Sequence, residues 1–243
     1  MNAPDPNPPP LAPGLYVVGT PIGNLGDITL RALDTLRTAS AIFAEDTRQT
    51  RKLLTRYDIH TPLVSCHQFN EAQRREKVLD HLDRHEAVAL VTDAGMPGVS
   101  DPGGRVVAAC HEAGHPVFAV PGPTAVTTGL ALSGLGAGGF IFAGFLPPKS
   151  AARRRRLSAW LELAGELPVV IYESTHRIRK LLADLSELAP DHTVYAGREL
   201  TKRFEESVVG TPGKLVAHFE QRSIKGEWVL VISLTLNRRD RHS

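Results

Sequence analysis

The sequence has few of the features that mark secreted or membrane proteins. It contains two cysteines, Cys66 and Cys110, and each lies among apolar residues of an expected strand or helix. We interpret both as buried thiols, because a disulfide framework needs more cysteines and an export signal. The longest apolar runs, such as residues 140–146, are much shorter than the roughly 18 residues of a membrane span. Residues 1–13 hold six prolines and no basic residue, which excludes a secretory signal. We expect a cytoplasmic protein with a disordered tail over residues 1–13.

Two common ligand signatures are also missing. A glycine-rich stretch, Gly19–Asp27, follows the apolar run at residues 15–18, but it ends in Gly26-Asp27-Ile28. A phosphate-binding P-loop would end in Gly-Lys-Ser/Thr, so a nucleoside triphosphate is not favoured, and the stretch can also be a purely structural turn. No Cys, His or Asp cluster has the spacing of metal ligands, so we expect no metal.

An apolar strand followed by a glycine-rich loop dominates the first half of the chain. Residues 87–91 are apolar without interruption, which is typical of a strand buried on both faces of a parallel sheet. Asp93 then stands at the carboxyl end of the strand, and Asp101-Pro102 has the pattern of a helix N-cap and first helical residue. Ligands of open α/β sheets bind beyond the carboxyl ends of the strands. We therefore expect a binding site here, unless Asp93 only braces its own loop.

The same strand–turn–helix unit occurs five times before residue 135. Asp27 is expected to cap the first helix, and Glu45-Asp46 follows the second strand, either as site carboxylates or as the acidic start of a helix. Pro121-Gly122-Pro123-Thr124-Ala125 gives another close-approach turn. The repetition predicts an α/β fold whose N-terminal domain, residues 14–146, contains a doubly wound parallel sheet.

The second half begins at the helix-breaking pair Pro147-Pro148, which we take as the domain boundary. Strands are expected at residues 169–172, 193–196 and 228–232. Ser174 or Thr175 would cap one helix, and Thr211-Pro212 would open another. The irregular or hairpin-like segment from Glu199 to Gly210 favours a mixed sheet. We therefore expect a C-terminal α/β domain over residues 147–236 and a basic tail over 237–243.

The net charge is only +2, but positive charge is concentrated in two segments. The first segment is expected to be helical and to lack a compensating acid; it comprises Lys149, Arg153, Arg154, Arg155 and Arg156. Its Lys149, Arg153 and Arg156 share one helix face by their spacing. The second segment contains Arg48, Arg51, Lys52 and Arg56. Such runs attract a phosphate backbone, although many are only solvated helix faces.

Five motifs follow one another along the chain: residues 19–27, Glu45-Asp46-Thr47-Arg48, residues 93–103, residues 121–125, and Tyr172-Glu173-Ser174-Thr175-His176-Arg177. In this order they closely resemble the small-subunit ribosomal RNA methyltransferases of the tetrapyrrole methylase superfamily, over residues 14–234. The resemblance implies S-adenosylmethionine as methyl donor, a two-domain α/β fold that holds the donor between its domains, and a homodimer. It also implies methyl transfer to the ribose 2′-hydroxyl of a cytidine in the decoding region of the 16S rRNA of the 30S ribosomal subunit.

The resemblance further implies which residues contact the donor. In the first domain these are Gly19, Pro21, Asp93, Val99, Ser100, Thr124 and Ala125. In the second they are Tyr172, Arg198, Glu199, Gly226, Glu227 and Trp228. The donor has no phosphate, which agrees with glycine-rich turns that lack a P-loop lysine. Carboxylates suit its cations, and turn N–H groups suit its carboxylate.

Methyl transfer requires a positioned hydroxyl and a group that accepts its proton. The candidate acceptors are Glu45, Asp46, Glu173 and His176, with Glu45 and Glu173 preferred. Lys202 and Arg198 are candidates for stabilising negative charge. RNA contacts are expected at Arg48 and in the basic run Lys149, Arg153, Arg154, Arg155 and Arg156. Two alternatives stay open, a methyltransferase acting on a tetrapyrrole and a non-catalytic RNA-binding assembly factor.

Overall fold

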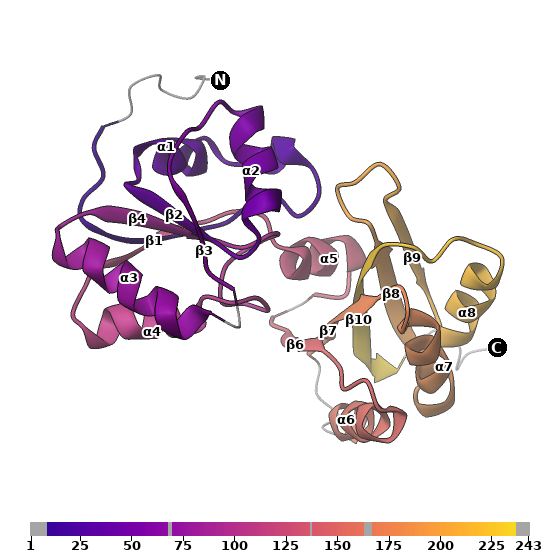
Figure 1. The fold of residues 1–243 in the computed structure, drawn as a ribbon. Helices are drawn as coiled ribbons and strands as arrows, with labels where there is room; N and C mark the ends of the chain where they lie inside the picture. Colours follow the sequence, from indigo (N-terminus) through magenta and orange to yellow (C-terminus); the bar gives the residue numbers. More distant parts are fainter. Residues whose placement is uncertain (1–8, 68–69, 137, 163–166, 237–243) are drawn as a thin grey trace. The chain divides into compact units, whose positions relative to one another are not determined.

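The computed structural model describes residues 9–67, 70–136, 138–162 and 167–236. Residues 1–8 of the expected N-terminal tail and the whole expected basic tail, residues 237–243, lie outside the described residues. The chain divides into two compact units, residues 1–124 and 125–243. Each unit is built around its own five-stranded sheet (Figure 1).

The sheet of the first unit is entirely parallel. Its strands are β1 (Gly14–Val18), β2 (Ala41–Ala44), β3 (Leu63–Ser65), β4 (Ala87–Val91) and β5 (Val117–Val120). They lie in the order β3-β2-β4-β1-β5, and every neighbouring pair is parallel. All five residues of β4 are buried, as its apolar run indicates. The predicted parallel sheet is confirmed.

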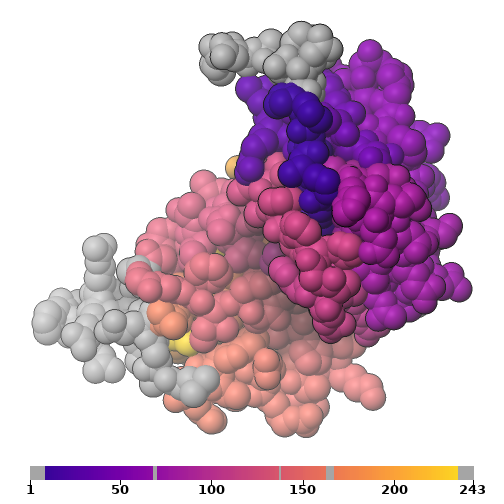
Figure 2. All heavy atoms as spheres, turned by 90° about the vertical axis from the view of Figure 1, so that its left-hand side faces the viewer, coloured from indigo at the N-terminus to yellow at the C-terminus, as the bar shows by residue number. Residues whose placement is uncertain are grey.

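Helices cover both faces of this sheet (Figure 1). They are α1 (Leu30–Thr38), α2 (Thr47–Arg56), α3 (Glu71–Asp83) and α4 (Gly104–Glu112). One core holds apolar residues of α1 and α2, and the other holds those of α3 and α4. Helices α3 and α4 also pack on each other, and their outer residues form the magenta surface of Figure 2. Cys66 and Cys110 are free and buried, and burial raises the pKa of both thiols to about 11.

The start of α1 differs from the expected one. Thr29 is its N-cap, and the Thr29 hydroxyl accepts a hydrogen bond of 3.1 Å from the N–H of Ala32. Asp27 instead ends a short 3-10 helix, η1 (Leu25–Asp27). The prediction that Asp27 caps the helix is therefore wrong by two positions.

The start of α4 also differs. The helix begins at Gly104, so Asp101 and Pro102 lie in the turn before it and Asp101 is not the cap. The buried carboxylate of Glu71 on α3 accepts hydrogen bonds from the N–H groups of Gly103 (3.1 Å) and Arg105 (3.2 Å). The first turn of α4 is therefore held by a side chain 32 residues before Gly103, and this side chain meets the donors that a local cap would satisfy.

The sheet of the second unit is mixed, as predicted. Its strands are β6 (Ile141–Phe145), β7 (Val169–Ser174), β8 (His192–Arg198), β9 (Glu206–Gly210) and β10 (Glu227–Leu236), in the order β6-β7-β10-β8-β9. Strands β6 and β7 are parallel, and the other pairs are antiparallel. Strands β8 and β9 form a hairpin, whose turn and second strand occupy the segment 199–210 that was expected to be irregular or hairpin-like.

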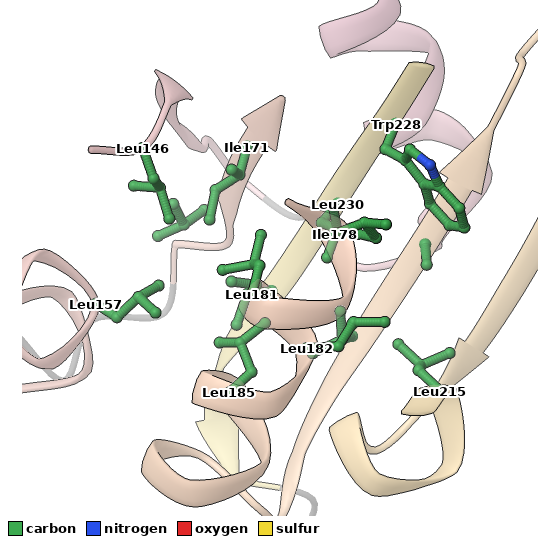
Figure 3. Close-up of a cluster of buried hydrophobic side chains, with 14 of the residues drawn as sticks. Leu146, Leu157, Ile171, Ile178, Leu181, Leu182, Leu185, Leu215, Trp228 and Leu230 are labelled. Carbon is green, nitrogen blue, oxygen red and sulfur yellow. The ribbon is translucent and has the colours of Figure 1, made fainter. Parts of the chain in front are cut away.

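Four helices belong to the second unit: α5 (Ala125–Ser133), α6 (Ser150–Glu162), α7 (Ile178–Leu188) and α8 (Pro212–Glu220). Helices α6, α7 and α8 contribute Leu157, Leu181 and Leu215 to the main core, where they meet Ile171 and Leu230 of the sheet (Figure 3). Thr211 and Pro212 open α8 as predicted. Helix α7 starts after Arg177, so neither Ser174 nor Thr175 is its N-cap.

The division between the units lies earlier than the boundary expected at Pro147-Pro148. Strand β6 pairs with β7, and α5 packs on β7, β8 and β10. A Cβ added to Gly129 of α5 would lie 2.7 Å from a methyl carbon of Val229, which shows how closely this helix approaches β10. Both elements therefore belong to the second sheet. Proline pairs break strands and helices, but they do not decide which sheet the preceding elements join.

Candidate functional site

Three loops meet at the carboxyl edge of the first sheet, because the strands before them are parallel neighbours. A Cβ on Gly19, after β1, would lie 2.7 Å from the Cα of Gly122, after β5, and 2.7 Å from the Met96 sulfur, after β4. Only glycine fits such a close approach. Thr20 and Gly95 exchange two backbone hydrogen bonds of 2.9 and 3.0 Å. We call these three segments, residues 19–27, 92–103 and 121–124, the edge loops.

The loop after β4 has three glycines in the left-handed region. The φ angles of Gly95, Gly98 and Gly103 are +85°, +79° and +124°. Val99 and Ser100 are exposed between them. Of the other expected donor contacts, Pro21 and Thr124 lie on the neighbouring edge loops, whereas Ala125 begins α5 of the second unit. The expected first-domain contacts thus gather at one sheet edge, apart from Ala125.

Carboxylates from two strand ends come together at the same edge. The backbone N–H of Asp46, after β2, donates to the Asp93 carboxylate at 3.0 Å, and the N–H of Asp93 donates to Glu45 Oε2 at 3.5 Å. Partial burial, and then the charges of Asp101 and Asp93, raise the pKa of Glu45. Burial also raises the pKa of Asp93. This edge therefore carries a concentrated negative potential and a carboxylate that accepts a proton more readily than usual.

Asp46 has a different environment from Glu45. It is the N-cap of α2, as one of the two sequence interpretations held, and its Oδ1 accepts from the Arg48 N–H at 2.8 Å. The Arg48 guanidinium also donates to both carboxylate oxygens, at 3.1 and 2.8 Å. These bonds to Arg48 lower the pKa of Asp46 to about 2. Asp46 therefore stays ionised near neutral pH and is poorly suited to take up a proton.

Helix α2 presents a basic face to solvent. A shallow groove along it is lined by Thr47, Arg48, Arg51, Lys52 and Thr55. Arg48 is engaged with Asp46, but no acid within the described part of the chain pairs with Arg51, Lys52 or Arg56. Lys52 donates to Gln49 Oε1 at 2.7 Å and Arg56 lies over the Tyr57 ring. The second basic segment is thus a surface with three exposed cations whose charges no described acid neutralises.

Several expected residues of the second unit meet where β8 ends and β10 begins. Lys202 Nζ lies 3.0 Å from Glu199 Oε1 and 2.7 Å from Glu227 Oε2. Although burial alone would lower it, these two carboxylates raise the pKa of Lys202. Gly226, at φ +121°, lies so close to Glu199 that a Cβ would be 2.3 Å from the Glu199 Cγ. Lys202 is therefore a fixed, paired cation.

Two neighbours of this cluster are also occupied. The Arg198 guanidinium pairs with Glu206 at 3.0 Å and donates to the Lys225 carbonyl at 2.9 Å. Trp228 is buried in the core, and its indole N–H donates to the Ile224 carbonyl at 3.0 Å. The Trp228 side chain is thus a core residue, so a ligand would reach its backbone more easily than its ring.

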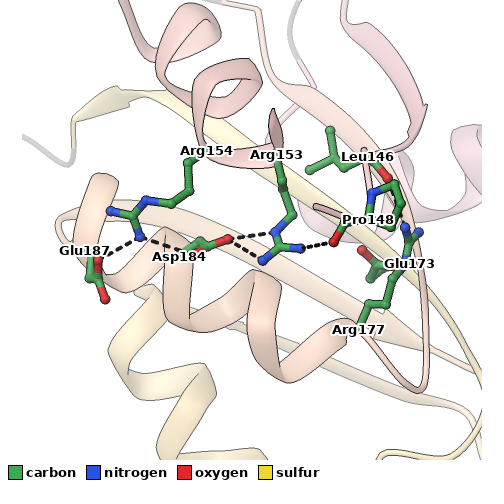
Figure 4. A network of polar contacts seen from close by, with 8 residues as sticks. All are labelled: Leu146, Pro148, Arg153, Arg154, Glu173, Arg177, Asp184 and Glu187. Carbon is green, nitrogen blue, oxygen red and sulfur yellow. Dashed lines mark hydrogen bonds and ion pairs between the residues drawn. The ribbon is translucent and has the colours of Figure 1, made fainter. Parts of the chain in front are cut away.

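Glu173 is inside the second unit rather than on its surface. Its side chain has 0% exposure, and its Oε1 accepts from Arg177 Nε at 2.7 Å (Figure 4). Arg177 also donates to the Leu146 carbonyl at 3.0 Å. Glu173 is enclosed within the unit and its Oε1 is already engaged by Arg177, so this geometry does not favour the proton-acceptor role predicted for Glu173. His176 beside it is exposed.

The basic run on α6 is not free of compensating acids, and that expectation is wrong. Arg153 is buried, with 3% of its side chain exposed, and its guanidinium lies 2.6 Å from Asp184 on α7 (Figure 4). Arg154 pairs with Asp184 at 3.1 Å and with Glu187 at 2.7 Å. Lys149, Arg155 and Arg156 are exposed, and no described acid pairs with them. Arg153 therefore fastens α6 to α7, and three cations of the run are left for a ligand.

Three residues that organise these sites were given no role of their own from the sequence, although Thr20 and Arg177 lie within two of the five motifs. Thr20 is buried and its hydroxyl donates to the Thr92 carbonyl at 3.0 Å, which ties two edge loops together. Glu71 holds the far end of the β4 loop, and Arg177 fixes Glu173. The only signals in the sequence were a polar residue within an otherwise glycine-rich turn and charged residues beside expected helix starts.

Within the described residues, no helix is long and apolar enough to cross a membrane. Nor does that part of the chain hold three or more His, Cys, Asp or Glu side chains placed to bind a metal ion.

The sequence profile described as Tetrapyrrole (Corrin/Porphyrin) Methylases matches residues 14–216. The chain belongs to this family. Solved structures with similar folds include a cobalt precorrin-4 methyltransferase, with a TM-score of 0.65, 16% identity and coverage of 91% of this chain and 95% of that one. A uroporphyrin-III-C-methyltransferase from Thermus thermophilus has a TM-score of 0.61, 20% identity and coverage of 90% and 94%. At such identities the likeness concerns the fold.

Curated relatives within the tetrapyrrole methylase family are much closer in sequence. A protein named Ribosomal RNA small subunit methyltransferase I from Thermotoga maritima is 43% identical over 90% of this chain and 97% of its own length. Proteins of the same name from Neisseria meningitidis and Vibrio cholerae are 44% and 45% identical, over 90% and 91% of this chain and 75% and 77% of their own lengths. These three relatives of the chain that carries the five motifs all have the same name.

Proposed function

We propose that this protein transfers a methyl group from S-adenosylmethionine to the ribose 2′-hydroxyl of a cytidine in the 16S rRNA of the small ribosomal subunit. The observation that carries this proposal is the identity of 41–45% to relatives named Ribosomal RNA small subunit methyltransferase I, over about nine-tenths of the chain. The geometry of the first unit agrees with it, because the edge loops lack the lysine of a phosphate site and carry carboxylates instead.

The edge loops fit the chemistry of the donor. The close approach of Gly19 to Gly122 leaves backbone, rather than side chains, at the sheet edge. Loop N–H groups near Val99 and Ser100 would bind the carboxylate of the donor, and Asp93 would bind its ammonium or ribose hydroxyls. When bound, the donor supplies a methyl carbon on a sulfonium, which is already an activated leaving group. In the second unit we propose contacts from Tyr172, Glu199 and the backbone at residues 226–228.

Glu45 is our choice for the proton acceptor. The ribose 2′-hydroxyl would have to lose its proton as it is methylated, and Glu45 would accept that proton at its carboxylate. The raised pKa of Glu45 makes it a better acceptor than Asp46, which Arg48 keeps ionised. Lys202, held by Glu199 and Glu227, would serve as a fixed positive charge near the RNA.

RNA contacts are proposed at the exposed cations of two helices. These are Lys149 just before α6, Arg155 and Arg156 on α6, and Arg51, Lys52 and Arg56 on α2. Arg48, which pairs with Asp46, lies beside them on α2 and is proposed as a further contact. Exposed cations without an acid partner release phosphate counterions from RNA on binding, which gives both affinity and salt dependence. A homodimer acting in the cytoplasm, both expected from the sequence, completes the proposal.

The test is to incubate the purified protein with methyl-labelled donor and, in parallel, 30S subunits, protein-free 16S rRNA and a precorrin. Label in RNA, followed by mapping of the ribose methylation to one cytidine, supports the proposal. Label only in the precorrin would make the protein a tetrapyrrole methyltransferase. RNA binding without donor binding in calorimetry would make it a non-catalytic assembly factor.

A further inference from the structure

Phe145, at the carboxyl end of β6, is an exposed aromatic residue that the functional assignments above do not use. Its exposure is 55%, although burying a phenylalanine side chain contributes about 1.5–3 kcal/mol. Ile141 and Ala143 of the same strand pack against the core of the second unit. Because side chains alternate along a strand, residue 145 would be expected on that core face as well.

A bulge in β6 moves Phe145 off the core. The register with β7 shifts between Phe142 and Gly144, and Gly144 has φ +60°. One extra residue in the strand exchanges the two faces, so Leu146 takes the core position and Phe145 is paired with Tyr172. Bulges of this kind often re-aim a side chain beside a functional site.

The ring of Phe145 packs against Tyr172 and Arg177 of the second unit. Its centroid lies 5.8 Å from that of Tyr172, whose ring in turn meets Phe142 at 5.0 Å. The Arg177 guanidinium lies over the Phe145 ring at 5.8 Å, and it is itself fixed by Glu173 and by the Leu146 carbonyl. The exposed ring therefore has packing partners before any ligand arrives, and a side chain that is already positioned loses less entropy on binding.

An exposed aromatic ring backed by a guanidinium plane suits a nucleobase. Lys149 follows Phe145 by four residues and is an exposed cation, and the Arg177 guanidinium lies over the ring itself. Proteins that bind single-stranded RNA stack unpaired bases on aromatic rings and arginine planes and hold the neighbouring phosphates with cations. We infer that Phe145 is a stacking platform for one unpaired base of the RNA substrate, an inference that rests on the proposed function.

The experiment compares Phe145→Ala, Phe145→Tyr and Phe145→Trp with the wild type. Val209→Ala is the matched control, since Val209 is 54% exposed on β9 at the opposite edge of the same sheet. Affinity is measured for a single-stranded RNA oligonucleotide of the decoding-region sequence and for its duplex, and donor binding is measured by calorimetry. Loss of one stacked base should weaken single-strand binding by about 5- to 150-fold in Phe145→Ala. The aromatic variants and Val209→Ala should bind as the wild type does, and the donor affinity of all variants should be unchanged.

Phe145→Trp adds a direct optical readout. The native Trp160 and Trp228 are buried, so stacking should quench the emission of the new, exposed tryptophan when the single-stranded oligonucleotide is added. Unchanged RNA affinity of Phe145→Ala, or a loss confined to donor binding, would overturn the inference while leaving RNA methylation by the wild type intact. A wild type that neither binds nor methylates RNA would overturn the proposed function and this inference with it.

Discussion

Replacing Arg153 with alanine should destabilise the second unit by about 3 kcal/mol, at the lower end of the 3–5 kcal/mol typical when one partner of a buried ion pair is removed. The Arg153 and Asp184 side chains are only 3% and 10% exposed, and Arg153 also donates to the Pro148 carbonyl at 3.3 Å. Without Arg153, the Asp184 carboxylate stays largely buried and keeps one cation, Arg154, at 3.1 Å. That remaining partner is the reason for the lower value.

Urea unfolding followed by tryptophan fluorescence measures this effect, because both tryptophans of the chain, Trp160 and Trp228, lie in the second unit. Arg155→Ala on the exposed face of the same helix is the control, and its effect should stay within about 0.5 kcal/mol. The double variant Arg153→Ala/Asp184→Ala should be less destabilised than the sum of the single variants. An Arg153→Ala protein as stable as Arg155→Ala would refute the structural role.

RNA binding should depend on the exposed Arg155 and Arg156 and not on the buried Arg153. Each lost contact to a single-stranded phosphate lowers the slope of log affinity against log salt by about 0.7. Removing Arg155 and Arg156 together should therefore flatten the slope by about 1.4, whereas Arg153→Ala, measured while folded, should leave it unchanged. A flatter slope for Arg153→Ala alone would place that guanidinium on RNA after all.

Three further predictions concern the first unit. Gly19→Ala should reduce donor affinity in calorimetry, since its Cβ would collide with Gly122 at 2.7 Å, while Gly104→Ala, with nothing within 4 Å of the added carbon, should bind normally. Glu71→Ala should lower the free energy of unfolding by about 2–4 kcal/mol, because the buried N–H of Gly103 and the partly buried N–H of Arg105 lose a charged acceptor, and hydrogen exchange at Gly103 and Arg105 should accelerate. The pKa of Glu45 is raised above its ordinary 4.5 in the folded protein, so the folded state binds this proton more tightly than the unfolded chain does. The stability of the wild type should therefore fall relative to that of Glu45→Gln as the pH rises from 4.5 through the raised pKa of Glu45. Paired thermal unfolding scans of the two proteins measure this difference.

The strands of the first sheet could be predicted because their signals are local, whereas β6 and β9 of the second sheet were not expected as strands. The apolar run at residues 87–91 identifies a doubly buried strand by itself, and its position before a glycine-rich turn places that turn at a sheet edge. The gathering of Glu45 and Asp93 follows from parallel topology alone, since the carboxyl ends of parallel strands lie on one side. The segment 199–210 was expected to be irregular or hairpin-like, and it holds the turn and the second strand of the hairpin that β9 forms with β8.

The caps and ion pairs could not be predicted in this way, because their partners are distant in sequence. Asp101 has the right type and position for an N-cap, yet Glu71, 32 residues before Gly103, takes the role. Arg153 is neutralised from 31 residues away. A local signal did exist for Arg153: Leu157 and Trp160 lie four and seven residues later and are buried, so helical periodicity places all three on one face.

The two carboxylates preferred from the sequence as proton acceptors differ through their neighbours and not through their burial alone. Glu173 is fully buried, but Arg177 at 2.7 Å compensates its charge. Glu45 is only partly buried, but the charges nearest to it, on Asp101 and Asp93, have the same sign as its own. Desolvation and neighbouring anions both raise the pKa of a carboxylate such as Glu45. A group that must take up a proton in the transition state and release it afterwards needs the second environment, and of these two residues Glu45 has it.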